Sequence, residues 1–234
     1  MGFGMEEERK LIRFLKENSS CKRKEGSSEM EKAIQRCSFV VLVVFVCFAF
    51  ITQGYGAINW WGDVQPPDPS SWTKSTYVYV GKDADGGISV TEGDEIETHN
   101  AYLGYESGVV GSATIDGAGS SWSCWHLYVG DKGQGTLNIS NGGNVSCWNG
   151  YIGKNTGSTG VVSVDGAGSS WSCDWDLSVG YSGQGTLEIS NGGYVSCWYG
   201  YIGNETDSTG EVSVEGEGSS WYCEYRLSVG CYGE

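Results

Sequence analysis

Five cysteines recur at nearly constant intervals in the second half of the chain, and their thiols could do chemistry. They are Cys124, Cys147, Cys173, Cys197 and Cys223, which are 23, 26, 24 and 26 residues apart. Regularly spaced thiols can pack as small apolar side chains, form disulfides with one another, or bind a metal ion. This part of the chain lacks the C-x-x-C or Cys/His clusters of zinc sites, so we expect no metal and no cofactor. Packing and disulfide formation both stay open.

Carboxylates also recur, and two of them at a suitable separation would allow acid–base cleavage of a glycosidic bond. The recurring acids are Asp116, Asp165 and Glu215, each just before a glycine, and Asp174, Asp176 and Glu224 near the Ser-Cys step. A glycosidase needs two carboxyls in different environments, about 5 to 9.5 Å apart, which breaks the monotony of a repeat. These acids follow the repeat, so we expect solvated turn residues. His99 and His126 lie in no recognisable nucleophile motif, and we expect no enzymatic activity.

Aromatic residues recur together with the cysteines. Trp148, Trp198 and Tyr199 are the residues that we expect to face a ligand, and Trp125, Trp175 and Tyr201 belong to the same recurring set. Rigid aromatic faces dominate many recognition surfaces. An outward-facing strip of these rings would therefore bind sugar rings or another surface protein.

All of these residues belong to a repeat of about fifty residues that divides into two similar halves. SNGGNVSCWNGYIG at 140–153 returns as SNGGYVSCWYGYIG at 190–203, and VDGAGSSWSC at 164–173 returns as VEGEGSSWYC at 214–223. Residues 135–159 and 160–184 each open with glycine, continue with alternating apolar residues, and contain glycine-bearing turns. Alternation at period two in short segments predicts strands rather than helices.

A unit of about 25 residues, with about three short strands, is too small to bury its apolar face alone, but stacked copies can do so. We therefore predict an all-β fold, a parallel β-helix (β-solenoid) with one coil per half-repeat and about six to seven coils. Equivalent side chains would stack about 4.8 Å apart, so the five cysteines would form a ladder. Their Cα atoms would lie within disulfide range, although parallel side chains in register are poorly aimed for the required torsion. A β-propeller is the alternative, but its blades of about 40 to 50 residues do not divide at 25.

The composition separates an N-terminal segment from the array. Residues 1–56 contain nine Lys and Arg against seven Asp and Glu, whereas residues 57–234 contain five against twenty-two. The later part therefore carries a net charge of 5 − 22 = −17, which would repel a phosphate backbone, and we expect no nucleic-acid partner. Residues 39–51 form an apolar run of thirteen, FVVLVVFVCFAFI, preceded by basic residues. This length suits a secretory signal segment better than a membrane span of about 20 residues.

We therefore expect three regions: an N-terminal extension and helical signal peptide at 1–57, a linker or N-terminal cap at 58–68, and the repeat array at 69–234. Cleavage after Gly54, Gly56 or Ala57, a start at Met30, and retention of the segment as an anchor all stay open. Only this segment would contact the membrane. The chain stops in mid-repeat at CYGE, so we expect the array to continue beyond Glu234 in a longer protein. An exposed end would favour end-to-end self-association.

The motif order GxLxISNGGxVS, GYIG, STGxVxVDGAGSSW and LxVG resembles the autotransporter and PEP-CTERM associated repeat, over most of the chain after Pro69. The resemblance implies an exported bacterial protein, secreted or held at the cell surface, with a structural or adhesive role and no assigned catalytic residues. We expect glycans or other surface proteins as partners. The alternatives are a fragment of a secreted β-helix enzyme that cleaves polysaccharides, and a purely structural self-assembling array.

Overall fold

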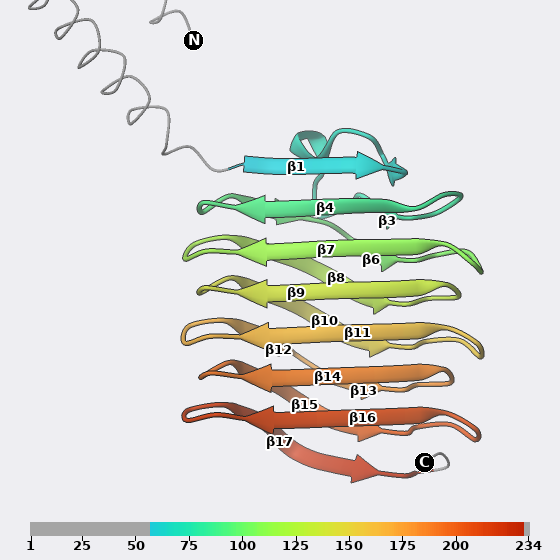
Figure 1. Cartoon of the computed structure of the whole chain (residues 1–234), viewed down its shortest axis with the longest axis vertical. Helices are drawn as coiled ribbons and strands as arrows, with labels where there is room; N and C mark the ends of the chain where they lie inside the picture. Colours follow the sequence, from blue (N-terminus) through green and yellow to red (C-terminus); the bar gives the residue numbers. More distant parts are fainter. Residues whose placement is uncertain (1–56, 232–234) are drawn as a thin grey trace, which may run out of the picture. The chain divides into compact units, whose positions relative to one another are not determined.

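The computed structural model describes residues 57–231, in which the chain alternates between two β-sheets, here sheet A and sheet B (Figure 1). Sheet A has, in spatial order, β1 (Ala57–Gly62), β4 (Gly86–Thr91), β7 (Val110–Asp116), β9 (Gln134–Ser140), β11 (Thr159–Asp165), β14 (Gln184–Ser190) and β16 (Thr209–Glu215). Sheet B has, in chain order, β2 (Val64–Gln65), β3 (Val78–Val80), β5 (Glu95–Glu97), β6 (Asn100–Leu103), β8 (Ser121–Val129), β10 (Asn144–Ile152), β12 (Ser170–Cys173), β13 (Asp176–Val179), β15 (Tyr194–Ile202) and β17 (Ser220–Val229). The prediction of an all-β solenoid is confirmed.

Strands of successive coils are parallel and in register. Leu137 of β9 pairs with Val162 of β11, and Val162 pairs with Leu187 of β14, so each step is 25 residues. The next step leads to Val212 of β16. The array therefore has about six turns of about 25 residues, as the half-period predicts. The signal helix expected at 39–51 lies outside the described residues.

The core lies between the two sheets and consists of inward side chains stacked in columns. In sheet B one inward column alternates large and small residues from coil to coil: Trp122, Val145, Trp171 and Val195, all fully buried. The neighbouring inward column alternates in step with it: Leu127, Gly150, Leu177 and Gly200. A coil with Trp and Leu is thus followed by a coil with Val and Gly.

The glycine of each Val-containing coil makes room for the tryptophan of the next coil. A Cβ atom added at Gly150 would lie 2.7 Å from Cζ2 of Trp171 and 2.9 Å from Cδ1 of Leu177. Protein cores are close-packed, so a large side chain in one layer requires a small one in the layer that it contacts. The fifty-residue period is therefore a pair of coils with complementary core residues.

The prediction of about three short strands per coil holds in two coils, those of β4, β5 and β6 and of β11, β12 and β13. It is wrong in the other coils, where the two sheet-B segments join into one strand. Strands β8, β10 and β15 each span nine residues. The pairing of β8 with β10 omits only Trp125 and Trp148, and the residues on both sides of these tryptophans keep the same partner strand. In two described coils the sheet-B strand is divided, into β5 and β6 in the first, and into β12 and β13, around Asp174 and Trp175, in the other.

The N-terminal end of the described solenoid differs from the coils. Strand β1 pairs antiparallel with β4, and β2 pairs antiparallel with β3. The short 3-10 helix η1 (Pro69–Ser71) leads to Trp72, which is buried and donates from Nε1 to the carbonyl oxygen of Pro66 at 3.1 Å. These strands pair with an edge of the first coil that would otherwise be open. Within residues 57–231, no helix is long and apolar enough to cross a membrane.

Each full-length sheet-B strand is followed by a glycine at which the chain turns toward sheet A, and this is the glycine of the L-x-V-G and GYIG motifs. Gly153 has a φ of 67°, and a Cβ atom there would lie 2.2 Å from the carbonyl oxygen of Gln184. Gly157 has a similar φ of 83°, but no atom lies within 4 Å of its Cβ position. The corner at Gly153 thus needs glycine for two reasons, and the turn at Gly157 for only one.

Substitution of these two glycines by alanine separates the cost of a steric clash with a neighbouring backbone from the cost of the left-handed backbone conformation. Both variants carry the left-handed penalty of about 1–2 kcal/mol. Only Gly153→Ala also drives a methyl group into a backbone carbonyl. We expect Gly157→Ala to lower the free energy of unfolding by about 1–2 kcal/mol and Gly153→Ala by more than about 4 kcal/mol. Denaturant titration of both variants measures this, and equal losses would contradict the corner geometry.

Candidate functional site

The outward face of sheet B carries a column of stacked aromatic rings with one ring per coil. This tryptophan column consists of Tyr77, His99, Trp125, Trp148, Trp175 and Trp198. Neighbouring tryptophan centroids along it are 5.1, 6.1 and 6.0 Å apart, with interplanar angles of 3°, 5° and 12°. His99 lies 6.5 Å from Trp125, and Tyr77 lies 4.7 Å from His99.

In the tryptophan column, the face of each inner ring is stacked on the face of the neighbouring ring. Near-parallel rings at these separations are offset-stacked, the arrangement that aromatic pairs favour. Trp148 has a ring on each side, Trp125 and Trp175, and its exposed fraction is 37%. The inner rings therefore offer a ligand their edges rather than their faces, which differs from the open strip that the sequence suggests.

A column of tyrosines runs beside the tryptophan column. It consists of Tyr79, Tyr102, Tyr128 and Tyr151, with neighbouring centroids 5.0, 4.6 and 5.1 Å apart. The Nζ atom of Lys154 lies 3.9 Å from the ring centroid of Tyr151 and 3.3 Å from that of Tyr181, which is a cation–π contact. Burial is the main cause that raises the pKa of Tyr128 and Tyr151, so both phenols stay protonated and can donate hydrogen bonds.

Polar side chains fill the positions between the two aromatic columns. Nδ2 of Asn149 lies 3.2 Å from Nδ1 of His126, and the backbone N–H of Asp176 donates to Oδ1 of Asn149 at 3.0 Å. Burial lowers the pKa of His126, with a further contribution from His99 and Lys154, so this imidazole is neutral at neutral pH. Burial also raises the pKa of Asp176. His126 and Asn149 of this strip therefore supply neutral donors and acceptors.

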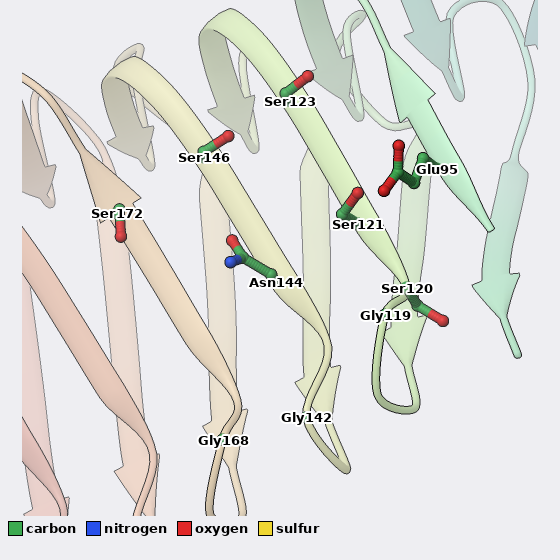
Figure 2. Close-up of a pocket in the computed structure, with 10 residues that line it drawn as sticks. All are labelled: Glu95, Gly119, Ser120, Ser121, Ser123, Gly142, Asn144, Ser146, Gly168 and Ser172. Atoms are coloured by element: carbon green, nitrogen blue, oxygen red, sulfur yellow. The ribbon is translucent and has the colours of Figure 1, made fainter. Parts of the chain in front are cut away.

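A groove lined by hydroxyl groups lies on the other side of the tryptophan column (Figure 2). Its polar side chains come from successive coils: Glu95, Ser121, Ser123, Asn144, Ser146 and Ser172. Figure 2 shows Glu95 on β5 and the other five on β8, β10 and β12, with the turn glycines Gly119, Gly142 and Gly168 at one side. Each serine hydroxyl can both donate and accept a hydrogen bond. The groove therefore suits a ligand that carries many hydroxyl groups.

The five recurring cysteines all lie on strands of sheet B, in β8, β10, β12, β15 and β17. Cys124 pairs in register with Cys147, Cys147 with Cys173, and Cys197 with Cys223. Cys147, Cys173 and Cys197 are buried in the core, and Cys124 and Cys223 are half-buried. In the described part of the chain, no group of three or more Cys, His, Asp or Glu side chains could hold a metal ion.

The recurring carboxylates connect the turns of neighbouring coils. Oδ1 of Asp165 accepts hydrogen bonds from the hydroxyl of Ser190 and from Nδ2 of Asn191, both at 2.6 Å. Oδ1 of Asp116 accepts from the equivalent residues one repeat earlier, Ser140 and Asn141, at 2.6 and 2.7 Å. Asn141 and Asn191 both have a φ of 51°, a left-handed conformation that asparagine tolerates. These carboxylates therefore hold strained turns in place.

The structure places the three expected ligand-facing residues on the outward side of sheet B, but not in one row. Trp148 and Trp198 belong to the tryptophan column and are separated by Trp175. Tyr199 lies beside the column, with its ring edge-on to Trp175 at 5.5 Å and to Tyr225 at 5.1 Å. The sequence analysis missed the tyrosine column, although a tyrosine two residues before the corner glycine in YVG, AYLG and GYIG was a usable signal.

Comparison of the chain with protein-family models, with curated proteins and with solved structures finds no match.

Removal of one inner ring tests whether the tryptophan column stabilises the fold. Trp148→Ala deletes two stacking contacts, each worth about 0.5–1.5 kcal/mol, and we expect a loss of about 1–3 kcal/mol in the free energy of unfolding. Trp60→Ala is the control, because Trp60 is 45% exposed and makes no ring contact within residues 57–231. Denaturant titration should show a clearly larger loss for Trp148→Ala. If Trp60→Ala costs as much, the column does not stabilise the fold.

The turn carboxylates predict a pH dependence. The hydrogen bonds from Ser190 and Asn191 lower the pKa of Asp165 below its usual range. The carboxylate thus stabilises the fold fully above the unfolded-state pKa of about 4, and this contribution is lost as the pH falls through the lower pKa of the folded state.

We therefore expect Asp165→Ala to lower the midpoint of thermal unfolding at neutral pH, and the difference from wild type to shrink in acid. Asp174→Ala is the control, since Asp174 is exposed and its side chain makes no hydrogen bond within the described residues. A difference between Asp165→Ala and wild type that stays constant with pH would refute the bracing role of the ionised carboxylate.

Proposed function

We propose that this chain is an exported, non-enzymatic repeat protein with a structural and adhesive role, either secreted or held at a bacterial cell surface. The observation that carries the proposal is the recurrence of similar outward side chains in successive coils of sheet B. Hydroxyl groups, ring edges and phenols return at strand spacings of about 4.8 Å. A surface of this kind suits an extended partner with a repeating structure better than a single reacting bond.

The support for export is in the sequence. The apolar run at 39–51 has the length of a secretory signal segment, and it precedes an acidic region, residues 57–234, that contains the repeat array. The motif order of the array resembles the autotransporter and PEP-CTERM associated repeat of exported bacterial proteins. Both features lead to the same location, outside the cytoplasm.

The hydrogen bonds of the recurring carboxylates support a non-enzymatic role. Asp116 and Asp165 each accept two hydrogen bonds from a neighbouring turn, and both repeat this arrangement in step with the coils. A pair of catalytic carboxyls would instead need two different environments at one place. Bracing of turns accounts for these acids without catalysis.

The adhesive surface that we propose comprises the hydroxyl groove, the tryptophan column and the polar strip beside it. Its side chains are serines, asparagines, a neutral His126 and tryptophan edges, all of which pair well with sugar hydroxyls and apolar sugar faces. The net charge of −17 for residues 57–234 would repel acidic polymers. The partner class that fits is therefore a neutral, linear polysaccharide.

Binding of the purified chain to an array of immobilised neutral and acidic polysaccharides tests the adhesive role. We expect binding to neutral linear chains, and a loss of at least about tenfold, or about 1.4 kcal/mol, in the double variant Trp148→Ala/Trp198→Ala. Trp60→Ala should bind as wild type does. Because the double variant loses stacking contacts, its folded fraction is measured first by circular dichroism.

Three outcomes would contradict the proposal. Binding that survives the double substitution would place the ligand elsewhere. Release of soluble sugar fragments from a bound polysaccharide would favour the β-helix enzyme. Absence of binding together with concentration-dependent association in sedimentation would favour the self-assembling array.

A further inference from the structure

The cysteine ladder is not uniform, because its sulfurs approach one another in pairs. Sγ of Cys147 lies 3.1 Å from Sγ of Cys173, and Sγ of Cys197 lies 3.3 Å from Sγ of Cys223. Within residues 57–231 these are the two close sulfur pairs. Cys124 belongs to neither pair, although it is in register with Cys147.

The pairing follows the alternation of the core. In each pair the first cysteine comes from a coil with valine in the core, and the second comes from the following coil with tryptophan. The indole Nε1–H of Trp171 donates to Sγ of Cys147 at 3.4 Å, across the same two coils. In the first pair, Trp171 thus orients the sulfur of Cys147 toward Cys173. In the second pair, Nε1 of Trp221 has no hydrogen-bond partner within residues 57–231, and the close approach of Cys197 and Cys223 does not depend on this bond.

The first such pair of coils has a threonine in place of one cysteine. Trp122 donates from Nε1 to Oγ1 of Thr98 at 3.1 Å, as Trp171 does to Cys147. Ile96 and Glu97 pair with Trp122 and Ser123, so Thr98 is the residue opposite Cys124. The partner position of Cys124 therefore carries a hydroxyl instead of a thiol, which leaves this cysteine unable to form the equivalent bond.

The distances allow a covalent bond in the two close pairs. Residues paired on adjacent strands are about 4.8 Å apart, which is within the Cα range of about 4.4–6.8 Å for disulfides. The sulfurs need to approach by only about 1 Å to reach the bond length of about 2.05 Å. The contact shows that the sulfurs of each pair face one another, so bond formation needs a small rotation of the side chains to reach the torsion of about 90° that a disulfide requires.

We propose that Cys147–Cys173 and Cys197–Cys223 form disulfides across neighbouring coils in the exported protein, and that Cys124 keeps its thiol. The oxidising environment in this proposal rests on the proposed function, because an exported protein leaves the reducing cytoplasm. The geometry of the two pairs does not depend on the proposed function. The oxidant is a small disulfide. A cysteine thiolate attacks one of its sulfurs and releases a thiol, and the second cysteine then displaces the other half. Two protein thiols thus lose two electrons and two protons, and the small disulfide becomes two thiols.

The environment of the second pair suits the first step of this exchange. The contact with Cys197 lowers the pKa of Cys223, and Cys223 is half-buried rather than buried. A thiolate at this position can therefore meet a small disulfide in solution. Burial is the main cause that raises the pKa of Cys173, so the first pair would be oxidised during folding, before its coil is covered.

Peptide mapping of the refolded full chain tests the pairing. The chain is refolded with oxidised and reduced glutathione, alkylated with iodoacetamide without reductant, and cleaved after acidic residues. Asp131, Asp165, Glu188 and Glu205 separate the five cysteines onto different peptides. We expect cross-linked peptides for 147–173 and 197–223 and an alkylated Cys124. Complete alkylation of all five, or cross-links 124–147 or 173–197, would overturn the proposal.

Two variants and one further preparation complete the test. Cys124→Ser should keep both cross-links, and Cys173→Ser should lose the first cross-link while it keeps the second. Wild-type protein should also show a lower midpoint of thermal unfolding after reduction, a measurement that needs no substitution. If the cross-links form on refolding but are absent from protein isolated from its own cells, the geometry holds and export is contradicted. If they do not form on refolding, the pairing is wrong in any compartment.

Discussion

The packing of a tryptophan of one coil over the glycine of the coil before it is the constraint on which the rest of the structure depends. Trp171 occupies the space that a side chain at Gly150 would need, so the two coils fit only in one register. Because the inward residues are held in register, the outward residues of successive coils also lie over one another. The tryptophan column, the tyrosine column and the cysteine ladder are consequences of this fit.

The same constraint shapes the chemistry of the surface. The faces of the stacked rings are covered by the neighbouring rings. The outward face of sheet B therefore presents ring edges, phenols and hydroxyl groups in repeated rows rather than a single pocket with distinct groups. The recurring carboxylates stabilise left-handed turns at Asn141 and Asn191. The sulfur pairs arise from the alternation of valine and tryptophan coils. The same columns of stacked side chains thus stabilise the fold and form the proposed binding surface.

Much of the fold was predictable from the sequence, because a period of fifty with a half-period of twenty-five defines the coil length and alternation defines the strands. The cysteine ladder followed from the same count. The number of strands per coil was not predictable, because pairing continues on both sides of Trp125 and Trp148 and joins two segments into one. Ring orientation at Tyr199 and the pairing of the sulfurs depend on rotamers and core neighbours, which the repeat pattern does not contain.

The most direct test is the spacing between equivalent residues of distant coils. Ser112 and Glu211 belong to one sheet-A column, in which Ser112, Thr136, Val161, Thr186 and Glu211 follow one another. Four strand spacings predict a backbone separation of about 19 Å, although the two residues are 99 positions apart in the sequence. Spin labels attached at these two positions through non-natural amino acids allow this distance to be measured by pulsed electron resonance. A single distribution near that distance agrees with the stack, whereas a separation beyond about 30 Å, more than six strand spacings, would contradict it.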